Sequence, residues 1–126
     1  MKAVEAEKFD IIEDQINGLY NELGILSKKK PDGAVNKFKL SFINDLIEKV
    51  NPLLGTKYIP FESFSGFDEE TVPTTSDVVL ILSQYLKNMD RFRYDNTRYK
   101  DGKLHWILDK GEPNKIAKRA HLHMRS

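Results

Sequence analysis

The chain has 126 residues, of which 40% are hydrophobic and 31% are charged, and its formal net charge is +1. This length suffices for one domain with one core. The absence of cysteine excludes disulfide bonds, thiolate metal sites and thiol catalysis. No apolar run approaches the roughly 20 residues of a membrane-spanning helix, so we expect a cytoplasmic protein with no membrane partner.

The first predicted helix covers residues 3–26 and carries an unbroken apolar pattern. Six apolar residues follow one another at steps of three and four, which is typical of a helix with a single apolar stripe. We call this stripe the seam; it consists of Phe9, Ile12, Ile16, Leu19, Leu23 and Leu26. A seam needs a partner helix, so it predicts packing within this chain or an oligomer interface with a second copy.

The second predicted helix covers residues 35–51, after a turn at Pro31-Asp32-Gly33. Asn51-Pro52 should end or kink it, because proline disfavours the helical region for the preceding residue, and Gly55 is a plausible cap. The connection that follows, residues 56–73, contains four aromatic residues. We expect an ordered loop that packs over the core, because a mobile linker would leave these aromatic side chains exposed to water.

The third predicted helix covers residues 75–95, with Thr74, Thr75 or Ser76 as its cap. A β-hairpin should follow over residues 98–108. Its turn is Asp101-Gly102, a strong hairpin signal, and Gly102 should have a positive φ. Alternation along the second arm places Leu104 and Trp106 on one face. In the basic tail, residues 111–126, we expect a short helix from about Lys115.

These elements predict a mainly α fold. The architecture is a three-helix bundle-like domain with a long ordered aromatic loop and a C-terminal β-hairpin, all within a single domain of residues 1–126. The first two helices should form an antiparallel pair, because their connecting turn is short.

Charge is distributed unevenly along the chain. Residues 1–27 hold two basic and six acidic side chains, a net charge of −4, whereas residues 86–126 hold eleven basic and five acidic ones, a net charge of +6. The basic third could contact nucleic acid or an acidic partner. The candidate contacts are Lys87, Arg91, Arg93, Arg98, Lys100, Lys103, Lys118 and Arg119. Alternatively, the acidic first helix folds back over the arginines and neutralises them.

The sequence contains no recognised catalytic pattern. It has no glycine-rich phosphate loop, no zinc-binding histidine pair at helical spacing and no nucleophile elbow. Arg98 and His105 have a spacing used by some helical ribonucleases, but an Asp-Gly turn separates them here. His121 and His123 lack a third ligand nearby in sequence. We therefore predict no catalytic residue, no metal and no cofactor.

The leading hypothesis is a small non-enzymatic helical protein that binds another protein or itself, in the latter case as a homo-oligomer. A nucleic-acid-binding module that uses residues 86–126 is the alternative. A small enzyme of unrecognised type is a third hypothesis, which the absence of catalytic patterns disfavours.

Overall fold

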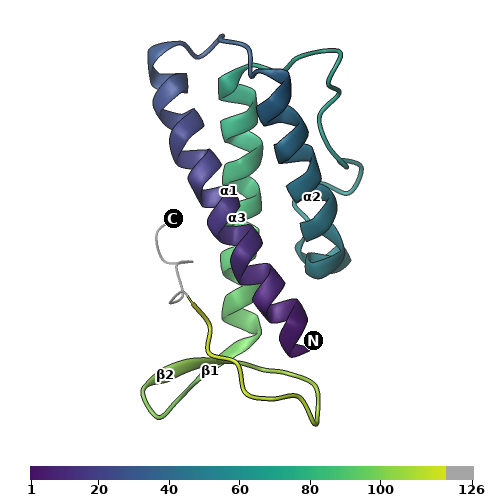
Figure 1. Ribbon diagram of the computed structural model, residues 1–126, viewed down its shortest axis with the longest axis vertical. Helices are drawn as coiled ribbons and strands as arrows, with labels where there is room; N and C mark the ends of the chain where they lie inside the picture. Colours follow the sequence, from purple (N-terminus) through teal and green to yellow (C-terminus); the bar gives the residue numbers. More distant parts are fainter. Residues whose placement is uncertain (119–126) are drawn as a thin grey trace.

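The computed structural model describes residues 1–118 and contains three helices followed by a two-stranded hairpin (Figure 1). The helices are α1 (Ala3–Lys29), α2 (Lys37–Tyr58) and α3 (Thr75–Asp95), and the strands are β1 (Thr97–Lys100) and β2 (Lys103–Trp106). The mainly α fold with a C-terminal hairpin is therefore confirmed. Over residues 1–118, no helix combines the length and apolarity needed to cross a membrane.

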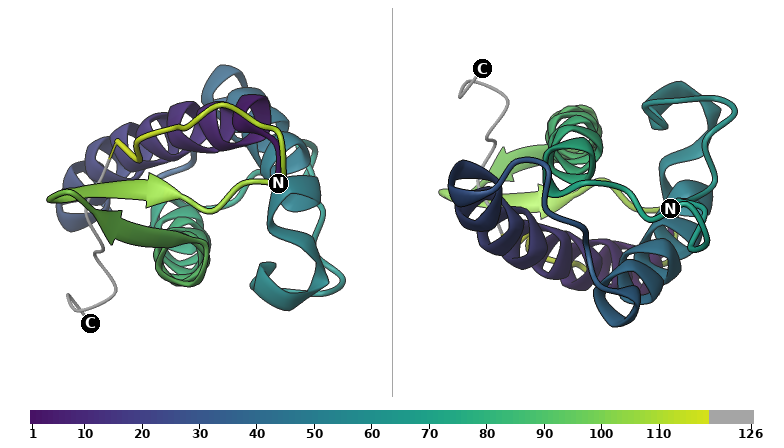
Figure 2. Two further views of the ribbon diagram at one scale, coloured as in Figure 1. Left: turned by 90° about the horizontal axis from the view of Figure 1, so that it is seen from below. Right: turned by 90° about the horizontal axis from the view of Figure 1, so that it is seen from above.

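The helices lie side by side, with α1 antiparallel to both α2 and α3 (Figure 1). The hairpin lies at the end of the bundle where α1 begins and α3 ends (Figures 1 and 2). The most extensive packing joins α1 to α3 rather than to α2. The first and third helices therefore form the centre of the fold.

Side-chain caps start the second and third helices. The Asn36 carboxamide accepts a hydrogen bond from the backbone of Lys39 at 2.8 Å, and the Thr74 hydroxyl accepts one from the backbone of Asp77 at 3.2 Å. Each bond satisfies a backbone donor that the first turn of a helix leaves without a partner. Of the three predicted candidates for the α3 cap, Thr74 is the residue used.

The second helix does not end at Asn51-Pro52 as predicted, but its backbone does break at Gly55, the residue expected to cap it. The helix continues through Pro52 to Tyr58, and its backbone breaks at Gly55, where φ is +72°. Leu54 and Tyr58 are buried, so apolar packing holds the additional turns against the core. Gly55 supplies the positive φ that other residues resist.

The long loop between α2 and α3 is ordered, as predicted. Phe64 packs edge-on against both Phe61 and Phe67. Asn44 of α2 forms two hydrogen bonds with the backbone of Phe67, donating to its carbonyl at 2.8 Å and accepting from its N–H at 2.7 Å. This amide pairs with the loop as a neighbouring strand would, and it fixes the loop on α2.

The seam is buried inside the chain. Five of its residues are at most 7% exposed, whereas Leu26 is 40% exposed. Phe9 stacks on Phe92 of α3 and packs edge-on against Trp106 of β2. These contacts use the seam for packing within the molecule, the first of its two predicted uses, and leave only Leu26 of the six exposed.

The hairpin has the predicted turn. Asp101 and Gly102 have φ values of +53° and +77°, the arrangement of a tight turn between antiparallel strands. Leu104 and Trp106 are both buried, as the predicted alternation requires. The predicted helix from Lys115 is wrong over the described residues, because Ile116 instead forms a β-bridge with His105.

Candidate functional site

A cluster of buried charges joins α1 to α3. The guanidinium of Arg93 forms ion pairs with Glu13, with Asp90 at 3.3 Å and with Asp10 at 3.8 Å. The side chains of all four residues are at most 1% exposed. Buried charges are tolerated only when they are paired. The acidic helix therefore neutralises Arg93, so the alternative that the charge distribution suggested holds for this one arginine.

The burial of Arg93 corrects the list of predicted contacts. A side chain that is 0% exposed cannot touch a nucleic acid or an acidic partner at the surface. The other described members of the list, Lys87, Arg91, Arg98, Lys100, Lys103 and Lys118, are exposed. Arg119 lies outside the described residues.

Two further lysines of the basic third are held by α1. Lys115 lies 3.3 Å from the carboxylate of Glu7, and Lys118 lies 3.9 Å from that of Asp14. Within residues 1–118, no ion pair joins Lys87, Arg91, Arg98, Lys100 or Lys103 to a carboxylate. These five exposed side chains fall into two groups, one on α3 and one on the hairpin.

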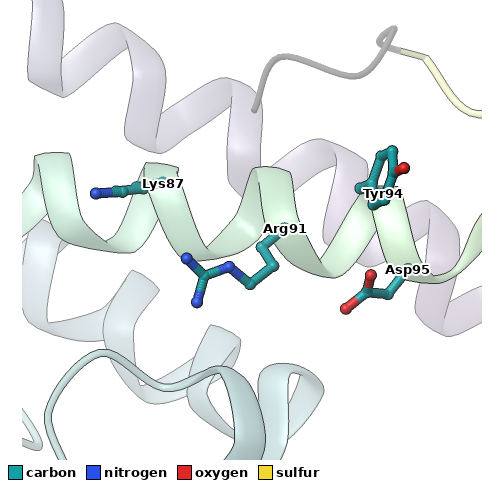
Figure 3. A pocket seen from close by; sticks show the side chains of 4 residues that line it. All are labelled: Lys87, Arg91, Tyr94 and Asp95. Atoms are coloured by element: carbon teal, nitrogen blue, oxygen red, sulfur yellow. The ribbon is translucent and has the colours of Figure 1, made fainter. Parts of the chain in front are cut away.

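The two cations of α3 border an open groove of about 390 Å³, lined by Lys87, Arg91, Tyr94 and Asp95 (Figure 3). Lys87, Arg91 and Asp95 follow one another at steps of four, so they lie along one stripe of α3. Asp95 accepts a hydrogen bond from the hydroxyl of Tyr58 at 2.5 Å. Burial and this bond raise the pKa of Tyr58, so the hydroxyl stays protonated and engages Asp95.

The remaining cations lie on one face of the hairpin. Arg98 is the cross-strand partner of His105, and Lys100 is the partner of Lys103. Partners in an antiparallel pair project to the same side, and so do residues two apart on one strand. These four residues therefore share a face, which we call the basic hairpin face. Its pairing also shows that Arg98 and His105 lie on strands rather than on a helix.

The basic hairpin face brings like charges together. Opposite residues have Cβ atoms roughly 4.5–5.5 Å apart, and like charges at that separation destabilise a hairpin. Lys100 and Lys103 flank the turn, so the strand register places them directly opposite each other. The two ammonium groups repel each other, and a bound anion would reduce this repulsion.

Two exposed tyrosines accompany these cations. Tyr94 is 51% exposed and follows Arg91 by three residues, nearly one helical turn. Tyr99 is 64% exposed and lies on β1 between Arg98 and Lys100, on the opposite face of the hairpin. Tyr94 therefore lies close to Arg91 on α3, whereas Tyr99 neighbours Arg98 and Lys100 in sequence but projects to the other face of the hairpin.

Residues 1–118 contain no group of three or more His, Asp or Glu side chains arranged to hold a metal ion. The pair His121 and His123 lies outside the described residues. Comparison of the chain with protein-family models, with curated proteins and with solved structures finds no significant match in any of the three. The functional argument therefore depends on the surface itself.

Proposed function

We propose that this chain is a small non-enzymatic protein that acts by binding another macromolecule, and that its partner is a nucleic acid. The observation that carries this proposal is the basic hairpin face, where Lys100 lies opposite Lys103 and Arg98 opposite His105. Phosphate groups bound along this face would replace a repulsion between side chains with attraction.

The accompanying tyrosines favour a nucleic acid over a simple anion. Bases of a single strand stack on exposed aromatic side chains while lysine and arginine follow the backbone. Tyr94 and Tyr99 are both more than half exposed, and each has a cation as a neighbour in sequence or one helical turn away. A single-stranded nucleic acid carries both phosphates for the basic hairpin face and bases for exposed tyrosines, although Tyr99 projects to the opposite face of the hairpin from Arg98 and Lys100.

The test is a titration of fluorescently labelled single-stranded RNA, single-stranded DNA and duplex DNA with the full chain at several salt concentrations. We expect dissociation constants of about 1–100 μM for single strands at physiological salt, which is the range of non-specific binding. The combined variant Arg98→Gln, Lys100→Gln and Lys103→Gln should weaken binding. It should also reduce the slope of log affinity against log salt by roughly 2. Arg93 is left unchanged because its substitution would disrupt the core.

The matched control changes Lys28, Lys29 and Lys30 to Gln. These lysines are exposed and end α1 at the opposite end of the bundle from the hairpin (Figure 1). The control removes the same net charge. Equal weakening of binding by both triple variants would therefore show that only the overall charge matters, and would contradict binding at the basic hairpin face. Absence of binding at low salt would refute the proposal itself.

A second candidate function is binding to a protein, including a second copy of this chain. Phe38 is 84% exposed and Phe42 is 39% exposed, and they lie one turn apart on α2. Adjacent exposed aromatic residues are typical of protein interfaces. Sedimentation over a range of concentrations tests self-association. Self-association would be supported by a measured mass above that of the monomer, together with a lower mass for the variant Phe38→Ser. A monomer mass at every concentration would exclude it.

A further inference from the structure

The segment that follows the hairpin, residues 107–118, runs along α1 and parallel to it; we call it the C-terminal strap (Figure 2, left). At its start, Asp109 donates its N–H to the carbonyl of Met1 at 2.9 Å. Glu112 then accepts a hydrogen bond from the N–H of Ala3 at 2.6 Å. The contacts therefore advance in the same order along the strap and along α1, as the parallel arrangement requires.

The second half of the strap is held to α1 by charged and polar contacts. Lys115 pairs with Glu7 and Lys118 with Asp14, and the backbone N–H of Lys118 donates to Asp10 at 3.4 Å. The four side chains of the two ion pairs are 34–57% exposed. Pairs this exposed are weak and are screened by salt.

The strap also forms a third, partial strand beside β2. The N–H of Trp106 donates to the carbonyl of Lys115 at 2.9 Å, and the N–H of Ala117 donates to that of Leu104 at 2.9 Å. The strap therefore covers the hairpin edge where Leu104 and Trp106 are buried.

The apolar content of the strap is small. Its two isoleucines point outward, with Ile107 39% and Ile116 47% exposed. Only Ala117 is buried in the core, and Leu108 packs partly against it. Segments with few buried apolar contacts and exposed hydrogen bonds open locally, at a smaller free energy than global unfolding.

We infer that the C-terminal strap is a latch, which opens as a unit while the three-helix core stays folded. Ion pairs and backbone hydrogen bonds hold it closed, and added salt favours the open form. Opening uncovers Trp106 and the buried carboxylate of Asp10 and frees Lys115 and Lys118 from α1. This inference does not depend on nucleic-acid binding.

The absence of cysteine from the chain gives a direct test, because one introduced thiol is a unique reporter. Ala117→Cys places a thiol on the buried side of the strap, and Ala6→Cys places one on the buried side of α1, where the native alanine is 0% exposed. Both substitutions add one sulfur at a buried alanine. Reaction of each thiol with a disulfide reagent is followed from about 0.05 M to about 0.5 M salt.

We expect the thiol of Ala117→Cys to react faster than that of Ala6→Cys, and its rate to rise roughly two- to tenfold over this salt range. The rate for Ala6→Cys should stay unchanged by salt. Equal rates for the two thiols at every salt concentration would mean that the strap opens only with the whole protein, and would overturn the inference.

Hydrogen exchange on the unmodified chain provides a second measurement. The backbone amides of Trp106 and Ala117 should exchange faster than that of Tyr85 in the middle of α3. The variant Glu7→Gln with Asp14→Asn should accelerate exchange of both amides, because it removes the ion pairs of Lys115 and Lys118, two of the three that hold the strap. Its control is Asp32→Asn with Glu48→Gln, two exposed carboxylates away from the strap. Amides of Trp106 and Ala117 as protected as that of Tyr85, or equal acceleration by both double variants, would refute the latch.

Discussion

The indole N–H of Trp106 donates a hydrogen bond of 3.3 Å to a carboxylate oxygen of Asp10, and both residues are buried. The same oxygen lies 3.4 Å from the backbone N–H of Lys118. One acceptor on α1 therefore holds both the hairpin and the C-terminal strap. The bond is polar and lies in the core, so its loss leaves a buried carboxylate with fewer donors.

Replacement of Trp106 by Phe should lower the free energy of unfolding by about 1–3 kcal/mol, because it removes the donor to a buried acceptor and shrinks a packed ring. Urea denaturation followed by circular dichroism measures this difference. Phe38→Leu is the control, since Phe38 is 84% exposed. Equal destabilisation by the two variants would contradict a structural role for the indole.

Replacement of Asp10 by Asn should change how stability depends on pH. Burial raises the pKa of Asp10 above its ordinary value of 3.8, although the Trp106 hydrogen bond and the charge of Arg93 oppose the shift. Folding therefore favours the protonated form. Its contribution to stability is fully present below pH 3.8 and is lost as the pH rises through the folded pKa.

The stability of Asp10→Asn relative to the unmodified chain should accordingly increase from about pH 4 to about pH 7, because the amide cannot ionise. Urea denaturation at a series of pH values gives this difference. Asp32→Asn, at an exposed carboxylate, serves as the control. Parallel pH profiles for Asp10→Asn and the unmodified chain would show that Asp10 has the same pKa in both states.

Replacement of Arg93 by Met should destabilise the fold by about 3–5 kcal/mol, because three buried carboxylates then lose their common cation. Arg91→Met removes an exposed arginine two residues away and should change stability by no more than about 0.5 kcal/mol. Thermal denaturation compares the two. Similar melting temperatures would show that the buried cluster contributes little.

Replacement of Gly102 by Val should destabilise the hairpin, by about 1–2 kcal/mol, because a β-branched residue resists the φ of +77° that this turn requires. Gly102→Asn is the matched variant, since asparagine tolerates positive φ. Hydrogen exchange at Leu104 reports on the hairpin directly. No difference between the two variants would mean that the turn does not constrain this position.

The elements that the sequence predicted correctly have local causes. The seam of α1, the cap at Thr74 and the turn at Asp101-Gly102 each follow from residues a few positions apart. The extension of α2 beyond Pro52 and the strand-like course of Ile116 depend instead on tertiary packing, against the core and against His105. Neither neighbour is visible to a local pattern.

The candidate site was predicted in part for the same reason. Exposed cations such as Arg98 are evident from the sequence, but the burial of Arg93 depends on packing against α1, whose Asp10 and Glu13 are far away in sequence. A signal for it exists: Asp10 and Glu13 directly follow seam residues, and Arg93 directly follows Phe92 of the α3 stripe. Opposite charges that flank two apolar stripes indicate that the stripes pack together.

The contacts of Asp10 with Trp106 and Lys118 span 96 and 108 positions of the chain. A protein whose first helix is completed by such distant residues must close long loops before its core forms, which slows folding. During synthesis, the seam of α1 therefore remains without its packing partners until α3 and the hairpin have left the ribosome. We expect ribosome-bound chains that end before residue 75 to expose Phe9 and Ile16 and to recruit chaperones that bind apolar helices.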